Sequence, residues 1–238
     1  AKKIENCIYK SAKGFILAVP EFKNYLDENP YSSEKPKLNL INGVSRKFIR
    51  EAEKTSNTND KQFTVLYSGN IGLAQKLETI LDAAHKLRNL PINFKFIGNG
   101  VQEDYLRRYA KEKKLNNIHF ENMMIRKDLI YSIKKSSVCM APLANKKLFK
   151  NAIPSKILEY LACKRPVICN DGSAGEIIKK AKGGLVVEAE NSTDLARAIK
   201  HYYENQSHIE IHGLNGFKYV CEKFIKEELV SDLLKKMS

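Results

Sequence analysis

The chain has 238 residues, of which 43% are hydrophobic and 29% are charged. That length suits one or two domains with buried cores, and the apolar fraction is ordinary for a globular protein. Neither a run of about eighteen apolar residues nor a signal-like leader occurs, so we expect neither a membrane-spanning nor an exported protein. The formal net charge of +14 predicts either attraction to an anionic partner or a solvated, lysine-rich surface.

The sequence contains neither nucleic-acid-binding motifs nor paired cysteines. Lysines outnumber arginines and are scattered, and no zinc-finger, RNP or zipper pattern occurs, so nucleic acid is not expected as a partner. The five cysteines form no Cys-x-x-Cys pair, and Cys139, Cys163 and Cys169 fall in apolar patterns. We therefore expect buried free thiols and a cytoplasmic location.

Residues 1–44 predict an incomplete folding unit. A helix-like stretch is followed by a β-rich run, a short helix and another strand, at 1–12, 13–20, 21–29 and 36–44. One βαβ unit is too small to bury a core alone, so it must pack against something else. The chain begins without Met inside a helical pattern, which indicates a piece of a longer protein. Residues 45–62 lose this periodicity and become polar, which predicts a linker.

Residues 63–205 alternate short β-branched runs with helical stretches. The strand-like runs lie at 63–69, 92–98, 117–122, 137–143, 166–170 and 185–190. Such alternation predicts an α/β fold with a doubly wound parallel sheet, joined by right-handed crossovers and covered by helices on both faces. Residues 206–238 then form a C-terminal segment with one amphipathic helix at roughly 208–236.

Ligands of doubly wound sheets bind beyond the carboxyl ends of the strands. The glycine-rich and polar segments of this chain follow five such ends, at 69–72, 98–100, 122–126, 142–155 and 170–175. Gly69 and Gly72 let a ligand approach the backbone closely. The segment IGNGVQ begins like a dinucleotide fingerprint, but Glu103 stands where its third glycine belongs, so an NAD site is not expected.

The stretch NAIPSKILEYLACKRPVICN (151–170) contains the strongest site candidate. Pro154 and Ser155 predict a helix start, with Ser155 as an N-cap candidate, and a helix N-terminus attracts phosphate. Glu159 follows on the same face, about 6 Å along the axis. It can accept hydrogen bonds from ribose hydroxyls, and the alternative is a surface acid paired with Lys156.

Lysines crowd this loop and helix start at Lys146, Lys147, Lys150 and Lys156. They can supply countercharge to a diphosphate, and the alternative is a solvated basic loop. No Asp-x-Asp motif occurs, so no metal and no cofactor are expected. The five histidines have no partners at catalytic spacing and are expected at the surface or in structural positions, and neither a P-loop nor Gly-x-Ser-x-Gly is present.

In combination, YSGNIGLAQKLETILDAA, FIGNG, PSKILEYLACKRPVI, GEIIKKAKGGLVV and DLARAI resemble the C-terminal half of glycosyltransferase family 4 enzymes. The nearest likeness is to bacterial transferases that build surface polysaccharides from UDP-linked N-acetylated sugars. The resemblance implies a GT-B fold, with two doubly wound domains facing a cleft. Residues 63–205 would be the Rossmann-like nucleotide-sugar-binding domain, 1–44 a remnant of the acceptor-side domain, 45–62 the linker, and 206–238 a helix returning toward the first domain.

The resemblance also implies roles for single residues. Glu159 matches the second acid of the family's Glu-x7-Glu motif, which holds ribose, and Asn151 falls on the first acid, which touches the donor sugar. Asn70 and Gln75 replace the family's Arg and Lys, which leaves the diphosphate to one of the nearby lysines. The implied nucleotide-sugar-binding residues are Gly69, Asn70, Gly72, Lys76, Met124, Ile125, Lys147, Ile153, Pro154, Ser155, Lys156 and Glu159.

The function implied is retaining, metal-independent transfer of a sugar from a UDP-sugar to a polysaccharide or lipid-linked acceptor, as in capsule or lipopolysaccharide synthesis. The enzyme would work in the cytoplasm, with peripheral association at the membrane face. A sugar-nucleotide epimerase and a non-catalytic nucleotide-binding module stay open as alternatives.

Overall fold

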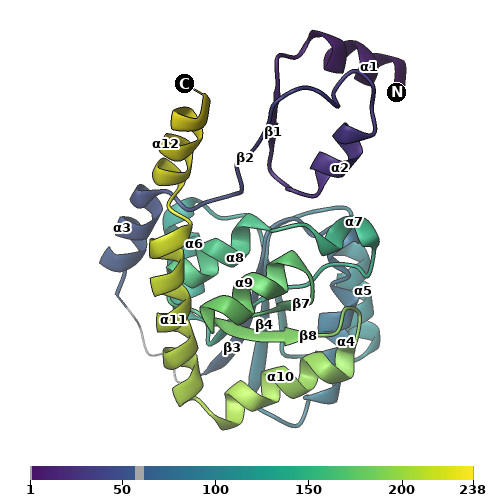
Figure 1. The fold of residues 1–238 in the computed structure, drawn as a ribbon. Helices are drawn as coiled ribbons and strands as arrows, with labels where there is room; N and C mark the ends of the chain where they lie inside the picture. Colours follow the sequence, from purple (N-terminus) through teal and green to yellow (C-terminus); the bar gives the residue numbers. More distant parts are fainter. Residues whose placement is uncertain (1, 57–61, 238) are drawn as a thin grey trace.

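A computed structural model describes residues 2–56 and 62–237 (Figure 1). Its larger sheet has six parallel strands in the order β5-β4-β3-β6-β7-β8. These are β3 (Phe63–Ser68), β4 (Ile92–Ile97), β5 (Ile118–Glu121), β6 (Val138–Ala141), β7 (Val167–Asn170) and β8 (Gly184–Val187). The expected α/β architecture with a doubly wound parallel sheet is confirmed.

Helices cover both faces of this sheet, since successive strand side chains point to opposite sides. Val65 and Tyr67 face one core, whereas Leu66 between them faces the other. The first face is covered by α4 (Glu78–Lys86), α5 (Glu103–Glu112) and α10 (Ser192–Glu204). The second is covered by α3 (Arg46–Lys54), α6 (Arg126–Lys135), α8 (Ser155–Ala162), α9 (Ser173–Ala181) and α11 (Ser207–Lys223). Every residue of β6 and β7 is buried, as expected for strands enclosed on both faces.

The strand order reverses between β3 and β6. The chain first adds β4 and β5 outward from β3, then returns through α6 to place β6 on the other side of β3. Loops that leave adjacent strands in opposite directions diverge, so this switch point is where a ligand crevice is expected. The short helices η1 (Leu73–Gln75) and α7 (Lys147–Lys150) belong to the loops on its two sides.

The N-terminal segment forms a separate small unit (Figure 1). It consists of α1 (Lys2–Ser11), β1 (Phe15–Leu17), α2 (Phe22–Asp27) and β2 (Lys37–Asn39). The two strands pair in parallel, which confirms the predicted βαβ unit. Leu17 and Leu26 are its buried apolar side chains, so its core is as small as the sequence predicts.

The segment through which the chain enters the large domain and the segment through which it leaves are hydrogen-bonded to each other. The amide of Val44 donates to the Phe224 carbonyl at 2.8 Å, and the amide of Lys226 donates to the Val44 carbonyl at 3.0 Å. Helix α12 (Lys226–Met237) begins directly after this contact. The chain therefore enters and leaves the large domain side by side.

The expectation of an aperiodic segment at 45–62 is wrong for α3, and residues 57–61 lie outside the described part of the chain. Ser45 caps α3 by accepting from the Phe48 amide at 3.1 Å. Phe48 and two neighbours on one face are buried, and the charged residues on the other face hide this stripe in the sequence. Lys134 closes the far end of the helix, since Nζ donates to the Ala52 carbonyl at 2.7 Å.

The single helix expected at roughly 208–236 is also wrong, because the structure has two. Helix α11 ends at Lys223 and α12 begins at Lys226. The intervening residues Phe224 and Ile225 are buried and lie against the Val44 backbone. Neither is Gly or Pro, so pairing with a distant segment sets the break.

We expect Phe48→Ala to destabilise the fold by about 3–5 kcal/mol, because it leaves a cavity under α3. Urea denaturation of the whole chain measures this difference. The exposed Arg50 on the same helix provides the control, since Arg50→Ala should change stability by no more than about 0.5 kcal/mol. Equal midpoints for the two variants would show that α3 is only a tether.

Candidate functional site

Helix α8 begins without a side-chain cap. Its N-cap residue is Pro154, in an extended conformation, so Ser155 is the first helical residue and not the N-cap that the sequence predicts. No described side chain accepts a hydrogen bond from the first turn, which leaves amide groups free to bind an anion. The carbonyl of Ile153, just before the helix, accepts from Asn42 Nδ2 at 3.2 Å.

The turn after β3 lies against this helix. Gly69 has a φ of +124°, and a Cβ there would lie 2.8 Å from Lys156 Nζ. Gly98, in the turn after β4, has a φ of +144°, and its Cβ would meet the Gly69 carbonyl oxygen at 2.0 Å. Both positions require glycine because of their backbone conformation and their crowding. The two glycine turns and the start of α8 thus form one continuous site.

Lys156 lies at the centre of this site. Its Nζ is 4.0 Å from the centroid of the Tyr67 ring, and among the described residues no carboxylate oxygen lies within salt-bridge distance of it. Burial lowers the pKa of Lys156 to about 7, and the negative charge of Glu159 acts in the opposite direction. The Tyr67 hydroxyl donates to the Asn70 carbonyl at 2.5 Å, which fixes the ring in place.

Glu159 lies one turn further along α8 and is half-buried. Burial raises the pKa of its carboxyl, while the positive charges of Arg126 and Lys156 lower it. Arg126 is the first residue of α6 and follows the exposed Ile125. The Glu159 carboxyl therefore lies within electrostatic reach of Arg126 at the start of α6, and in the described structure it forms no direct ion pair with Lys156.

A second tyrosine joins α8 to β3. The amide of Ser68 donates to Tyr160 Oη at 2.8 Å, and Ser68 Oγ lies 2.9 Å from the same oxygen. Tyr160 is fully buried, and burial raises the pKa of its hydroxyl, which therefore stays protonated. This contact sets the height of α8 relative to the turn at Gly69.

Several residues at the predicted nucleotide-sugar site already contact other protein groups. Lys76 Nζ lies 3.3 Å from a Glu78 carboxylate oxygen, so its charge already has a partner. The Gln75 side chain accepts from the Gly72 amide at 3.2 Å, and the Asn70 amide group packs over Gly72. The side chain of Lys147 lies outside the described part of the structure.

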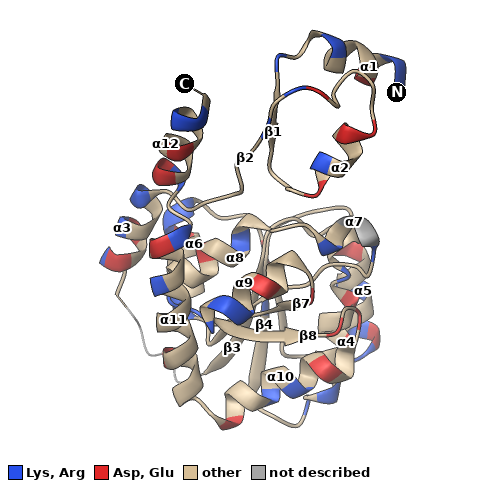
Figure 2. Cartoon of the chain, viewed as in Figure 1, with Lys and Arg blue, Asp and Glu red and all other residues tan. Residues whose placement is uncertain are grey.

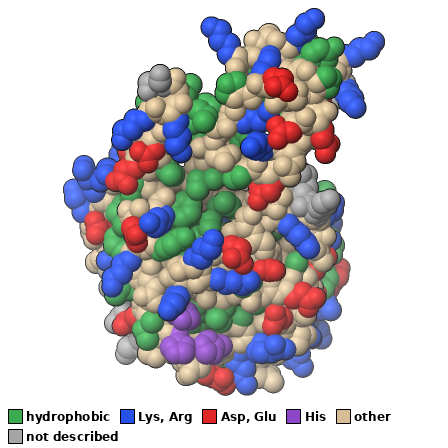
Figure 3. Space-filling model, in the orientation of Figure 1, with side chains coloured by type: hydrophobic (Ala, Val, Ile, Leu, Met, Phe, Trp, Pro, Cys, Tyr) green, Lys and Arg blue, Asp and Glu red, His purple; other side chains and the backbone are tan. Residues whose placement is uncertain are grey.

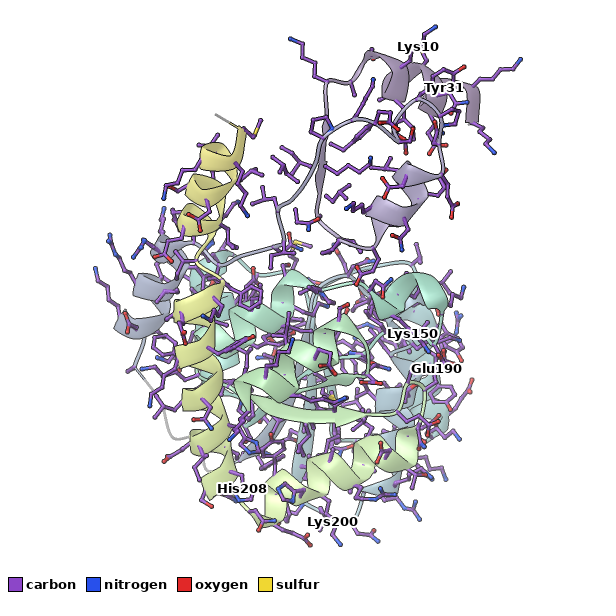
Figure 4. All side chains as sticks on the ribbon, viewed as in Figure 1. Lys10, Tyr31, Lys150, Glu190, Lys200 and His208 are labelled. Carbon is purple, nitrogen blue, oxygen red and sulfur yellow. The ribbon has the colours of Figure 1, made fainter. Side chains whose placement is uncertain are left out.

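Asn151 ends α7 and is half-buried, three residues before Pro154 and α8. Next to it, across the ends of β6, β7 and β8, lies a cavity of about 280 Å³ that is lined by Lys150, Gly172 and Glu188 among others. Figure 4 shows Lys150 at this edge of the domain, on the side of the N-terminal segment. Met124, which precedes Ile125, is half-buried and accepts a weak hydrogen bond from the Ser132 hydroxyl at 3.5 Å.

The sequence did not single out Tyr67, Tyr160 or Arg126. Their only signal is a position next to a glycine turn, to Glu159 or to Ile125, and buried tyrosines in these patterns are more often ordinary core residues. Asn42 was not singled out either, and its contact with the Ile153 carbonyl was not expected.

Three of the histidines have hydrogen-bonding contacts that the sequence did not predict. His201 Nε2 lies 2.8 Å from His208 Nδ1, and His212 Nδ1 lies 2.7 Å from Tyr202 Oη. They gather where α10 meets α11, at the end of the domain far from the N-terminal segment (Figures 3 and 4). Among residues 2–56 and 62–237, no group of three or more His, Cys, Asp or Glu is arranged to hold a metal.

The cysteines behave as expected, since Cys139, Cys163 and Cys169 are buried free thiols. In the described ranges, no helix combines the length and the apolar character needed to cross a bilayer.

Comparison with known proteins identifies the family. Residues 48–218 match the family described as glycosyl transferases group 1. An uncharacterised glycosyltransferase of Methanocaldococcus jannaschii is 26% identical over 92% of this chain and 58% of its own length. The O-antigen chain mannosyltransferase C of Escherichia coli is 24% identical over 94% of this chain and 58% of its own length. The chain thus spans less than two thirds of these relatives.

Solved structures of the same fold cover nearly the whole chain. Sucrose-phosphate synthase of Thermosynechococcus elongatus superposes with a TM-score of 0.80 at 20% identity, over 99% of this chain and 61% of its own. HepE of Anabaena, solved with UDP and glucose, gives 0.77 at 13% identity, over 99% and 66%. These neighbours are GT-B glycosyltransferases, and the chain shares their α/β fold. The family match covers more than half of the sequence, and the chain therefore belongs to the group 1 glycosyl transferases.

Proposed function

We propose that this chain binds a UDP-sugar where the end of β3, the start of α8 and the start of α6 come together, as the donor-binding part of a family 4 glycosyltransferase. One observation carries the proposal: the uncapped start of α8, the amine of Lys156 and the backbone of Gly69 meet at the switch point of the sheet. Amide groups, a helix dipole and a cation directed at one place are what a diphosphate needs.

The rest of the donor would extend from the diphosphate along α8. Glu159, one turn away, would accept hydrogen bonds from the ribose hydroxyls, with Arg126 holding the carboxylate charged. The base would lie on the backbone at Met124 and Ile125, near the exposed start of α6. HepE, which shares this fold, was solved with UDP and glucose.

The donor sugar would lie toward Asn151, on the loop before α8. Transfer would break the bond between the anomeric carbon and the diphosphate and form a bond from the acceptor oxygen on the same face of the sugar. The acceptor's proton would pass to the departing phosphate oxygen, which makes UDP a better leaving group. Lysines and amides, rather than a metal, would neutralise the diphosphate.

The acceptor and the location complete the proposal. A relative that is 24% identical over 94% of this chain is named O-antigen chain mannosyltransferase C, which supports a polysaccharide or lipid-linked acceptor. Residues 1–44 would belong to the acceptor side, and α3 together with residues 63–205 to the donor side. Lys and Arg are distributed over the N-terminal segment and the helices of the large domain (Figure 2), and their excess would favour contact with the cytoplasmic membrane face.

The ribose role predicts that Glu159→Ala weakens UDP binding about ten- to a hundredfold, the effect of losing a charged hydrogen-bond acceptor worth roughly 1.5–3 kcal/mol. Calorimetric titration with UDP measures it, with and without EDTA. The exposed Glu112, the last residue of α5, gives the control, since Glu112→Ala should bind UDP as the wild type does.

The same titrations separate the alternatives. Binding of NAD but not of UDP would rule out the transferase, and unchanged affinity in Glu159→Ala would remove the ribose role. Loss of binding in EDTA would contradict the metal-independent site. UDP-sugar epimerisation in place of transfer or hydrolysis would identify an epimerase, and binding without turnover in the full-length protein would identify a module.

The role of Asn151 predicts a different pattern. Asn151→Ala should leave the affinity for UDP unchanged and weaken UDP-GlcNAc about two- to tenfold, since one neutral hydrogen bond to the sugar is lost. The ratio of the two dissociation constants is the measurement. An equal loss for both ligands would show that Asn151 supports the loop and does not contact the sugar.

Electrostatic membrane association predicts that the protein floats with anionic vesicles at low salt and is released at about 0.5 M salt, where charges are screened within a few ångströms. Vesicles of zwitterionic lipid serve as the control. Equal binding to both kinds of vesicle, or to neither, would contradict it.

A further inference from the structure

The amine of Lys156 occupies an enclosed position that faces the glycine turn. Tyr67 of β3 lies beneath it, with the ring centroid 4.0 Å from Nζ. Nζ lies so close to Gly69 that a Cβ on this residue would be 2.8 Å from it. The polar end of the side chain thus lies between the Tyr67 ring and the turn at Gly69, at the place proposed for the diphosphate.

Few charges face this amine. On its own helix, Glu159 lies one turn away, and Arg126 of α6 partly balances that carboxylate. From β3 the titratable group is the Tyr67 phenol, whose pKa is raised by burial, so it carries no charge. Burial and the lack of an ion-pair partner disfavour the charged amine, in keeping with its lowered pKa, while the Tyr67 ring and the Glu159 charge act in the opposite direction.

We propose that Lys156 takes up a proton when the donor's diphosphate binds, so that donor binding and protonation of this amine are one coupled event. The inference rests on the proposed function. The amine and a proton from the solvent form the ammonium, no other bond changes, and the proton is released again when the diphosphate leaves. The Tyr67 ring, whose centroid lies 4.0 Å from Nζ, attracts the charged form of the amine and so supports the uptake of the proton.

The rest of the site explains why this falls to Lys156. Asn70 and Gln75 carry no charge, and the Lys76 ammonium already contacts Glu78. Lys150 is exposed and lines the cavity beside Gly172, away from the Tyr67 ring. Lys156 is the enclosed cation at the start of α8 in the described part of the chain, and only an enclosed amine changes its protonation state appreciably on meeting an anion.

The coupling has a defined direction. Binding favours the charged amine, so the free protein must gain a proton at any pH above the pKa of its unbound amine. Affinity should therefore fall as pH rises. With an unbound pKa of about 7, the dissociation constant for UDP-GlcNAc should rise about tenfold from pH 6 to pH 8. The two phosphates of UDP-GlcNAc are diesters and stay ionised throughout this range, so the ligand contributes no proton of its own.

The experiment is calorimetric titration of the full chain with UDP-GlcNAc in buffers of different ionisation enthalpy. The dependence of the heat on the buffer gives the protons taken up, with about 0.9 expected at pH 8 and about 0.1 at pH 6. UDP at pH 8, where its terminal phosphate is already ionised, serves as a second ligand in case the sugar is not accepted.

Matched variants assign the proton. Lys156→Arg is charged at every pH, so it should bind without uptake and with a flat pH profile. Lys156→Met should show no uptake and at least tenfold weaker binding. Tyr67→Phe keeps the ring and should keep the uptake, and Lys86→Met, at an exposed site on α4, should match the wild type. Circular dichroism confirms that each variant is folded.

The outcomes are distinct. If UDP-GlcNAc or UDP binds with the same heat in every buffer at pH 8, the coupling is overturned and the proposed function stands. If uptake persists in Lys156→Arg, the proton belongs to another group and the inference is overturned. If neither ligand binds, the proposed function itself is overturned, and the inference with it.

Discussion

Two tyrosines fix helix α8 to strand β3 from opposite sides. Tyr160, on the helix, reaches the backbone and hydroxyl of Ser68, and Tyr67, on the strand, holds Lys156 of the helix. A buried hydroxyl without a partner is costly, so the Tyr160 contact resists any slide of the helix. The distance between Lys156 and Gly69 is therefore set by the core, and the site inherits the rigidity of the sheet.

This attachment explains how a small set of charges could bind the proposed diphosphate. The chain has uncharged residues at 70 and 75, and Lys76 is engaged by Glu78. What remains is an open helix end and one enclosed amine, and both point at the same turn. Interactions in an enclosed place are stronger than those among exposed lysines, which water and salt screen. The enclosed position of one amine and one helix end can thus take the place of several exposed charges.

The fold was largely predictable because its strands are buried on both faces and alternate with helices. The start of α8 and the place of Glu159 also follow from helix spacing. Helix α3 was missed because charged residues surround its short buried stripe, and the break after Lys223 was missed because the distant Val44 backbone causes it.

At the site, the features that could not be predicted from the sequence are contacts between residues that lie far apart in the chain. Nothing in the local pattern distinguishes Tyr67 and Tyr160 from other buried aromatic residues, since their roles depend on which helix lies opposite which strand. The N-cap at Pro154 was displaced by one residue from the expected Ser155, because an extended proline can begin a helix without offering a side-chain acceptor. Patterns predict elements well and their mutual contacts poorly.

The side-by-side crossing at Val44 has a mechanical consequence. The chain passes this pairing once before α3 and once after α11, so the backbone of Val44 is fixed to the large domain by Phe224 and Lys226. Asn42, two residues earlier, donates to the Ile153 carbonyl just before α8. The N-terminal segment is therefore linked to the loop before α8 through a donor that lies next to a fixed point of the backbone.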